Sequence, residues 1–139
     1  MLFIERIKGS LFVKILIADD SMTMRRIIVN ALINYGASHD NILEAEDGER
    51  ALELWQAESD KIGLALFDWN MPKMNGLNVL HVIRDVDKTV PIIMVTTHSD
   101  KTDVVAAVSE GATNYIIKPF EVDTLVSKVS QFIDIKELA

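Results

Sequence analysis

Short apolar runs alternate with segments of helical periodicity along this sequence of 139 residues. The first run, residues 13–18, is rich in β-branched side chains, and after it apolar residues recur at the spacing of one helix face until Gly36. Later strands are predicted at residues 41–45, 63–67, 90–95 and 114–117, and later helices at residues 48–59, 75–86 and 100–110, with a last apolar stripe from Val122 to Ile133. Five such units predict an α/β fold, in which helices cover both faces of a doubly wound parallel sheet.

Composition limits the classes of protein to which the chain can belong. It has 14 basic and 21 acidic side chains, hence a formal charge of −7, and 49% of its residues are apolar. That charge argues against a nucleic-acid-binding protein, because such proteins need a basic surface. The absence of cysteine excludes disulfide scaffolds, zinc–cysteine clusters and thiol catalysis. The length fits one domain, predicted at residues 13–136 and preceded by a short extension, residues 1–12.

No segment of the sequence is typical of a membrane span or a secretory signal. The longest uncharged run, residues 27–39, is shorter than the roughly 18 residues that a spanning helix needs. Charged side chains at Glu5, Arg6 and Lys8 interrupt the apolar N-terminal stretch. The sequence therefore predicts a cytoplasmic protein with no membrane partner.

Polar residues follow four of the predicted strands: Asp19 and Asp20 the first, Asp68 the third, Thr96 the fourth and Lys118 the fifth. Ligands of open α/β sheets bind beyond the carboxyl ends of the strands, so these side chains are predicted to converge at one edge. Taken singly, each has a structural explanation. Asp20 or Ser21 can cap a helix, Asp68 can form a turn, Thr96 can cap a helix and Lys118 can be a solvated side chain. Those explanations do not account for the placement of all five at one edge.

Three carboxylates held close together repel one another, so they would take up a proton or bind a cation. Ligands that are all oxygens favour a hard ion, Mg²⁺ in preference to Zn²⁺ or Cu²⁺. A metal ion, a lysine and a hydroxyl around a carboxylate can also support phosphoryl transfer, with the carboxylate as nucleophile. The residues at this edge therefore predict Mg²⁺ binding and phosphoryl chemistry.

Five separated motifs connect this sequence with a known family. They are Ala18-Asp19-Asp20-Ser21, Asp68-Trp69-Asn70-Met71-Pro72, Met74-Asn75-Gly76, Met94-Val95-Thr96 and Tyr115-Ile116-Ile117-Lys118-Pro119-Phe120. In this order, over residues 13–135, the sequence resembles a response regulator receiver domain, in particular one of the stand-alone chemotaxis (CheY) type. The resemblance implies a flavodoxin-like (βα)5 domain whose five-stranded parallel sheet has the order 2-1-3-4-5.

The resemblance implies a role for each clustered polar residue. Asp68 would accept a phosphoryl group from the phosphohistidine of a histidine kinase. Asp20, Asp68 and the backbone carbonyl of Asn70 would bind Mg²⁺, with Asp19 acting through water. Lys118 would pair with the phosphoryl oxygens.

The resemblance also implies that Thr96 and Tyr115 form a switch. The Thr96 hydroxyl would move to bond the phosphoryl group, and Tyr115 would rotate inward with it. The alternative for Tyr115 is a half-buried sheet aromatic whose hydroxyl faces water. The Lys118–Pro119 bond would be cis. A phosphoryl group adds about two negative charges. It would therefore shift an existing equilibrium and change how the surface of the fourth helix, last strand and last helix binds a partner.

One residue departs from the pattern of the family. His98 stands two residues after Thr96, where CheY-type proteins often carry an acid. With Asn70, this position would border the phosphoryl group and help to set its lifetime. Because histidine changes charge near neutral pH, dephosphorylation is predicted to depend on pH, the alternative being a solvated loop histidine. His39 and His81 have no partners at metal-ligand spacing and are predicted to be surface or helix residues.

The resemblance implies a single-domain response regulator of a two-component phosphorelay, most simply in chemotaxis and flagellar motor control. It would not be an enzyme beyond self-catalysed phosphoryl acceptance and autodephosphorylation. Its partners would be a histidine kinase, a flagellar motor switch protein or another protein that binds the phosphorylated form, and a phosphatase, with the regulator itself a monomer. The alternatives are a phosphorelay shuttle or phosphate-sink receiver outside chemotaxis and, less favoured, a phosphorylation-independent scaffold.

Two enzyme classes on similar folds fit the sequence less well. A hydrolase of the haloacid dehalogenase type has a second aspartate where Asn70 stands, two residues after the nucleophile. A dinucleotide-dependent enzyme has a glycine-rich loop where Asp19-Asp20-Ser21-Met22 follows the first strand.

Overall fold

The computed structural model describes residues 13–139, so the predicted extension at residues 1–12 lies outside the described part. One five-stranded parallel sheet has the order β2-β1-β3-β4-β5, which confirms the predicted fold class and the strand order that the resemblance implied. The strands are β1 (Lys14–Ala18), β2 (Ile42–Ala45), β3 (Ile62–Phe67), β4 (Ile92–Thr96) and β5 (Asn114–Ile117).

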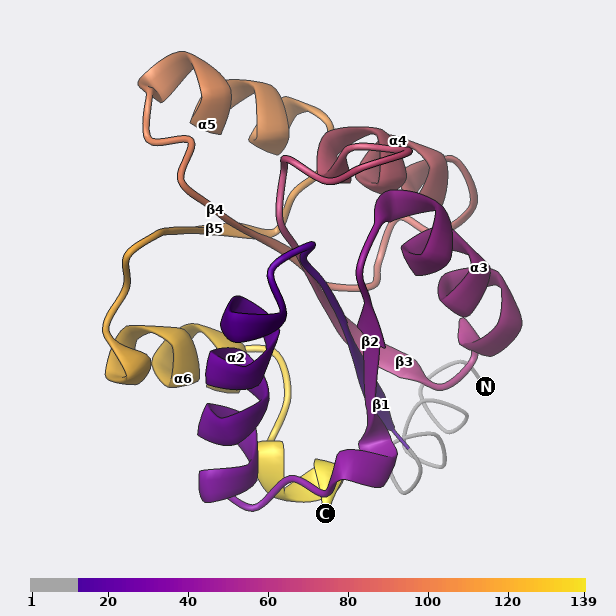
Figure 1. The fold of residues 1–139 in the computed structure, drawn as a ribbon. Helices are drawn as coiled ribbons and strands as arrows, with labels where there is room; N and C mark the ends of the chain where they lie inside the picture. The colour runs from indigo at the N-terminus through magenta and orange to yellow at the C-terminus, as the bar shows by residue number, and fades with distance from the viewer. Residues whose placement is uncertain (1–12) are drawn as a thin grey trace.

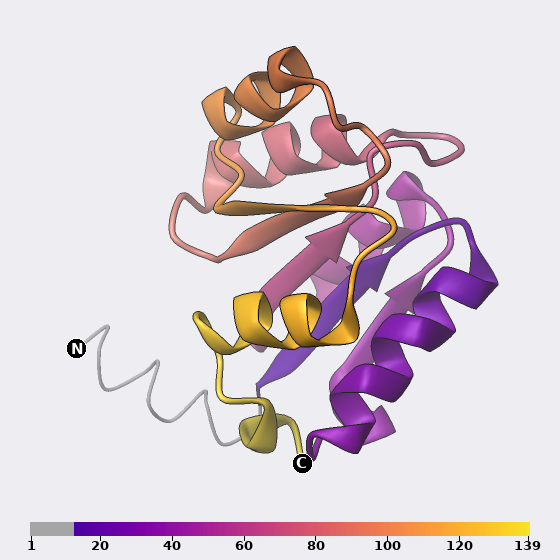
Figure 2. The ribbon, with the colours of Figure 1, turned by 90° about the vertical axis from the view of Figure 1, so that its left-hand side faces the viewer.

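Within residues 13–139, five α-helices cover the two faces of the sheet. They are α2 (Met22–Asn34), α3 (Gly48–Glu58), α4 (Gly76–Val86), α5 (Lys101–Ser109) and α6 (Val122–Ser130), with short 3₁₀ helices η1 (His39–Asn41) and η2 (Ile135–Leu138). Figures 1 and 2 show α2 and α6 on one face and α3, α4 and α5 on the other. In the described residues, no helix has the length and apolar character of a membrane span.

The alternation of side chains along β1 divides the apolar core into two layers. Ile15 and Ile17 pack with α2 and α6, whereas Leu16 and Ala18 pack with α3 and α4. Because successive side chains of a strand point to opposite faces, a strand buried on both faces is apolar at every position. Packing in both layers holds each strand in place, and thus positions the residues that follow its end.

Where the predicted boundaries differ from the observed ones, they do so by one to three residues, at strand ends as well as at helix caps. The helix predicted from residue 75 begins at Gly76, because the side chain of Asn75 accepts a hydrogen bond from the amide of Asn78 and so forms the N-cap. Asp100 precedes α5 as its N-cap residue, but its side chain makes no capping hydrogen bond. The last helix ends at Ser130, so Ile133, which belongs to the same apolar stripe, packs into the core from the following turn.

Gly76 allows α4 to begin directly against the backbone of Asp68. A Cβ atom at this position would overlap the carbonyl oxygen of Asp68, and the Gly76 amide donates to the carbonyl of Trp69 over 2.8 Å. The start of α4 therefore sets the path of the chain immediately after β3.

We expect Gly76→Ala to lower the free energy of unfolding by about 1–3 kcal/mol, because the added methyl group must displace the Asp68 carbonyl. Denaturant unfolding monitored by circular dichroism measures this change. Asn78→Ala, at an exposed site on the same helix, is the matched control and should change stability by less than about 0.5 kcal/mol. Equal stabilities of the two variants would contradict the close approach.

Candidate functional site

Three aspartates from two loops meet at the carboxyl edge of the sheet. Asp19 and Asp20 follow β1, and Asp68 follows β3, the neighbouring strand. Each offers a carboxylate oxygen, and these oxygens all lie within 4.8 Å of one another. Asp19 and Asp68 are buried and Asp20 is exposed. The structure thus brings together the three carboxylates that the sequence predicted to converge.

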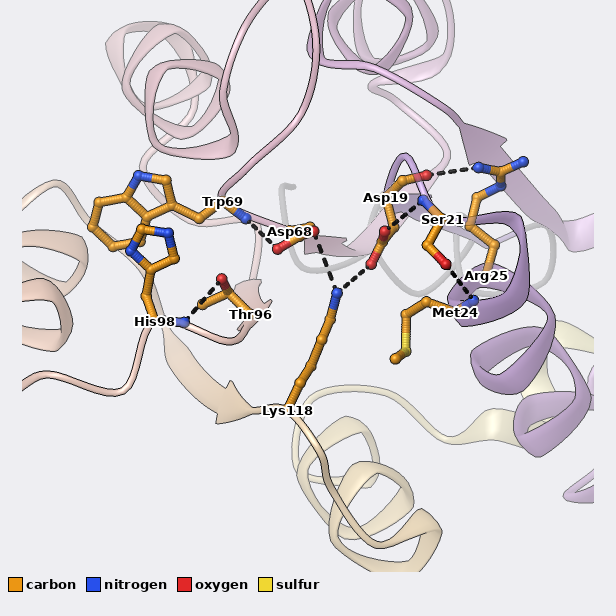
Figure 3. Close-up of polar contacts among 9 residues, drawn as sticks. All are labelled: Asp19, Ser21, Met24, Arg25, Asp68, Trp69, Thr96, His98 and Lys118. Carbon is orange, nitrogen blue, oxygen red and sulfur yellow. Dashed lines mark hydrogen bonds and ion pairs between the residues drawn. The ribbon is translucent and has the colours of Figure 1, made fainter.

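Lys118 places its ammonium group between two of these carboxylates. Its Nζ atom lies 2.6 Å from Oδ2 of Asp19 and 3.3 Å from Oδ2 of Asp68 (Figure 3). Only 10% of the lysine side chain is exposed, so the alternative of a solvated lysine is wrong. The amide of Lys118 donates to the carbonyl of Thr96, and the Lys118–Pro119 bond is cis, as the resemblance implied.

Burial raises the pKa of Asp68 above its ordinary value. The charge of Lys118 and hydrogen bonds from Lys118 and Thr96 act in the opposite direction, whereas the nearby charge of Asp19 raises the pKa further. The net shift is upward, because removing a carboxylate from water penalises its charged form. Extra positive charge near Asp68 would relieve this penalty.

Ser21, and not an aspartate, caps α2. Its hydroxyl accepts a hydrogen bond from the amide of Met24, while Oδ1 of Asp19 accepts one from the amide of Ser21. Among residues 13–139, the carboxylate of Asp20 makes no hydrogen bond or ion pair, so Asp20 does not cap the helix. The side chain of Met22, which follows the cap, is exposed.

Arg25 contacts this site although no sequence motif indicates a role for it. Its Nη1 donates to the backbone carbonyl of Asp19 over 2.6 Å, and its Nε donates to Glu44 on β2 over 3.1 Å. A basic residue one helical turn after the cap is the only signal in the sequence, and a solvated arginine would give the same signal.

Thr96 and Tyr115 both form hydrogen bonds with the backbone of His98, the residue that departs from the family pattern. Thr96 is fully buried, and its hydroxyl accepts a hydrogen bond from the amide of His98. The hydroxyl of Tyr115 donates to the carbonyl of His98 over 2.7 Å, so the alternative of a hydroxyl in water is wrong. Burial, followed by the charges of Asp103 and Asp68, raises the pKa of Tyr115 to about 12.

The ring of His98 stacks on the indole of Trp69. The ring centroids are 4.5 Å apart and the planes differ by 1° (Figure 3). Nδ1 of His98 lies 3.2 Å from Oδ2 of Asp103 on α5, and 25% of the histidine side chain is exposed. The alternative of a solvated loop histidine is therefore wrong: this residue joins the loops after β3 and β4 to each other and to α5.

The remaining predicted residues, Asn70, His39 and His81, are exposed to solvent. Asn70 is exposed, and its side chain makes no hydrogen bond within the described part of the chain. His39 is exposed in η1. His81 on α4 pairs with Glu110, and a hydrogen bond to Glu110, then the charges of Glu110 and Asp85, raise the pKa of His81.

The chemistry of the donors fits a hard divalent cation. All three side chains offer oxygen, and no cysteine or histidine takes part in the cluster. Three carboxylates and one ammonium leave two uncompensated negative charges at the site. The charge of Mg²⁺ equals that deficit.

Comparison with known proteins agrees with this arrangement. The family model of the response regulator receiver domain matches residues 15–130. The chain belongs to the response regulator receiver family. The chemotaxis protein CheY homolog of Campylobacter jejuni is 46% identical over 118 residues, which cover 84% of this chain and 88% of that protein. Chemotaxis protein CheY1 of Helicobacter pylori is 45% identical, with coverage of 84% and 93%.

Solved receiver structures share the fold. Vibrio cholerae CheY4 superposes with a TM-score of 0.78 at 28% identity, covering 88% of this chain and 99% of that one. A complex of CheX, CheY, BeF3 and Mg²⁺ from Borrelia burgdorferi contains a chain with a TM-score of 0.77 at 24% identity, and the coverage is 86% and 87%. The second likeness concerns the fold alone.

The raised pKa of Asp68 predicts that this receiver domain becomes more stable when the charge is removed. Well below pH 4 the carboxyl is protonated in both the folded and the unfolded chain, so it has little effect. At higher pH the unfolded chain ionises this carboxyl more readily than the folded chain does. Stability is therefore lost as pH rises through the raised folded-state pKa. Metal-free Asp68→Asn should therefore have a higher Tm than wild type at pH 7, and the difference should shrink toward pH 3.

Thermal unfolding in EDTA, monitored by circular dichroism across this pH range, measures the difference. Asp60→Asn, at an exposed site, is the control for loss of a negative charge. A Tm of Asp68→Asn at or below that of wild type at pH 7 would contradict the prediction.

Proposed function

We propose that this receiver domain is a phosphorylation-dependent switch of the chemotaxis type, with Asp68 as the phosphoacceptor. The observation that carries the proposal is the buried carboxylate of Asp68, with two further aspartates on one side and Lys118 within 3.3 Å. A phosphohistidine of a histidine kinase is the donor. The names of the relatives support chemotaxis as the setting.

Asp68 acts as a nucleophile in this reaction. One of its carboxylate oxygens forms a bond to phosphorus while the P–N bond of the phosphohistidine breaks, and the electron pair stays on the imidazole nitrogen of the donor, which takes up a proton. Lys118 neutralises the phosphoryl oxygens after giving up its contact with Asp68. Water later attacks the acyl phosphate, so acceptance and autodephosphorylation are the only chemistry.

The carboxylates of Asp20 and Asp68 and the backbone carbonyl of Asn70 are the proposed Mg²⁺ ligands, with Asp19 acting through water. When bound, Mg²⁺ supplies positive charge that reduces repulsion between the carboxylates and the incoming phosphoryl group. Asp19 already accepts hydrogen bonds from Ser21 and Lys118, which leaves Asp20 with the least occupied carboxylate of the three.

Thr96 and Tyr115 transmit the change. The hydroxyl of Thr96, now bonded by the His98 amide, turns to the phosphoryl oxygens. Tyr115 is buried and its hydroxyl bonds the His98 carbonyl, so a shift of this loop and a shift of the tyrosine are coupled. The surface of α5, β5 and α6 carries exposed apolar side chains, which support its role as the partner-binding face: Val105, Val108, Ile117 and Val122.

The proposed partners are proteins. A histidine kinase phosphorylates the domain, the phosphorylated form binds a flagellar motor switch protein, and a phosphatase removes the phosphoryl group. The domain acts as a cytoplasmic monomer without nucleic acid. A shuttle that passes the phosphoryl group to a histidine phosphotransfer protein would use the same chemistry and differs only in the output partner.

Incubation with acetyl phosphate and Mg²⁺ tests the proposed chemistry. Intact-mass measurement should detect one added phosphoryl group that is absent in EDTA and in Asp68→Asn. If no adduct forms, beryllofluoride titration with Trp69 fluorescence separates rapid hydrolysis from an inert site. No response to beryllofluoride in a folded protein would contradict the proposal and favour the scaffold alternative.

His98 gives a prediction about the lifetime of the acyl phosphate. Because an imidazole can change its charge with pH and this ring lies beside Trp69 and Asp103, we expect the dephosphorylation rate to depend on pH. His98→Ala should flatten the profile. His98→Phe keeps a ring that can stack on Trp69 but cannot titrate, so it should be flat as well.

The measurement is the decay of phosphorylated protein by mass spectrometry after removal of the donor. His81→Ala, which removes a histidine from α4, is the control and should keep the profile of the wild type. Identical pH profiles for wild type and both His98 variants would refute this role of His98.

A further inference from the structure

The guanidinium group of Arg25 holds the backbone that carries two of the clustered carboxylates. From α2, Nη1 donates to the carbonyl of Asp19 over 2.6 Å and Nε donates to Oε1 of Glu44 over 3.1 Å; Figure 3 shows the first of these contacts. Only 13% of the arginine side chain is exposed. A planar guanidinium can make both contacts at once, whereas the compact ammonium of a lysine is a single point charge.

The Asp19 carbonyl belongs to the peptide plane between Asp19 and Asp20. The amide of Asp19 is bonded to the carbonyl of Ala45 on β2, so the backbone is held on both sides of that residue. Asp20 has no such support: it is exposed, and in residues 13–139 its carboxylate has no hydrogen bond or ion pair. Its position near Asp68 therefore depends on the two flanking peptide planes: Arg25 holds the preceding one, and the Ser21 amide, which donates to Asp19, belongs to the following one.

We infer that Arg25 is a positioning residue for the cation site, an inference that rests on the proposed binding of Mg²⁺ by Asp20 and Asp68. Residues that hydrogen-bond to the groups around a metal change its affinity without touching the ion. By fixing the Asp19–Asp20 peptide plane, Arg25 keeps Asp20 near Asp68 before the cation arrives. Less conformational freedom is then lost on binding.

The charge of Arg25 would act in the opposite direction from its geometry, since a positive group repels a cation. Glu44 compensates for this charge, so the pair as a whole is neutral. Removal of the arginine side chain distinguishes the two effects. Loss of positioning weakens Mg²⁺ binding, whereas loss of repulsion strengthens it.

The experiment is a titration of the full chain with Mg²⁺ alone, followed by the fluorescence of Trp69, whose amide donates to Oδ1 of Asp68. We expect the Mg²⁺ affinity of Arg25→Met to fall roughly tenfold. The affinity of Arg25→Lys should fall as well, because this variant keeps the charge but loses the two-point contact. Arg26→Met is the matched control: Arg26 is exposed, has no ion pair among residues 13–139, and should bind Mg²⁺ like wild type.

Thermal unfolding with and without Mg²⁺ provides the second measurement. A lower Tm of metal-free Arg25→Met with unchanged Mg²⁺ affinity would overturn the inference, because Arg25 would then only stabilise the fold. Unchanged or tighter Mg²⁺ binding by Arg25→Met would also overturn it. If Arg25→Met does not fold, Arg25→Lys decides by the same criterion. If Mg²⁺ changes neither the fluorescence nor the Tm of the wild-type chain, the proposed metal site is wrong, and this role of Arg25 is wrong with it.

Discussion

The contact of Lys118 with two buried carboxylates is the interaction on which this site depends. Asp19 and Asp68 lie at the ends of neighbouring strands, so the sheet itself forces their charges together. Without a cation between them, one carboxyl would have to be protonated or the loops would have to separate. Lys118 lowers the pKa of Asp68, but burial and, to a smaller extent, the charge of Asp19 raise it, so that the pKa stays above its ordinary value. The fold thus holds a site whose negative charge is incompletely compensated.

His98 connects that site with the surface formed by α5. Its ring stacks on Trp69, next to the proposed phosphoacceptor, and its Nδ1 faces Asp103 on α5. Its backbone amide and carbonyl bond Thr96 and Tyr115. Movement of any of these four neighbours therefore changes the surroundings of the other three. An acid at this position could not provide the stacked ring, so the coupling between the two loops in this chain depends on histidine.

Much of this arrangement could be predicted from the sequence. Hydrophobic periodicity located the five strands and five helices, and the placement of polar residues at strand ends located Asp19, Asp68 and Lys118. The sequence could not indicate which side chains touch across loops. The stack of His98 on Trp69 joins residues 29 positions apart, and the reach of Arg25 to the Asp19 carbonyl depends on the angle at which α2 leaves β1. The local sequence pattern does not predict either contact, because both are determined by tertiary packing.

The burial of Asp68, the proposed phosphoacceptor, determines which groups an added charge would affect. Asp68 is shielded from water, so a charge added there is poorly screened and acts strongly on the groups nearest to it. Those groups are Lys118, which anchors the end of β5, and Thr96, which ends β4. Both strands lead directly into the loops before α5 and α6. A phosphoryl group on Asp68 would therefore act first on the two strand ends that determine where these helices begin.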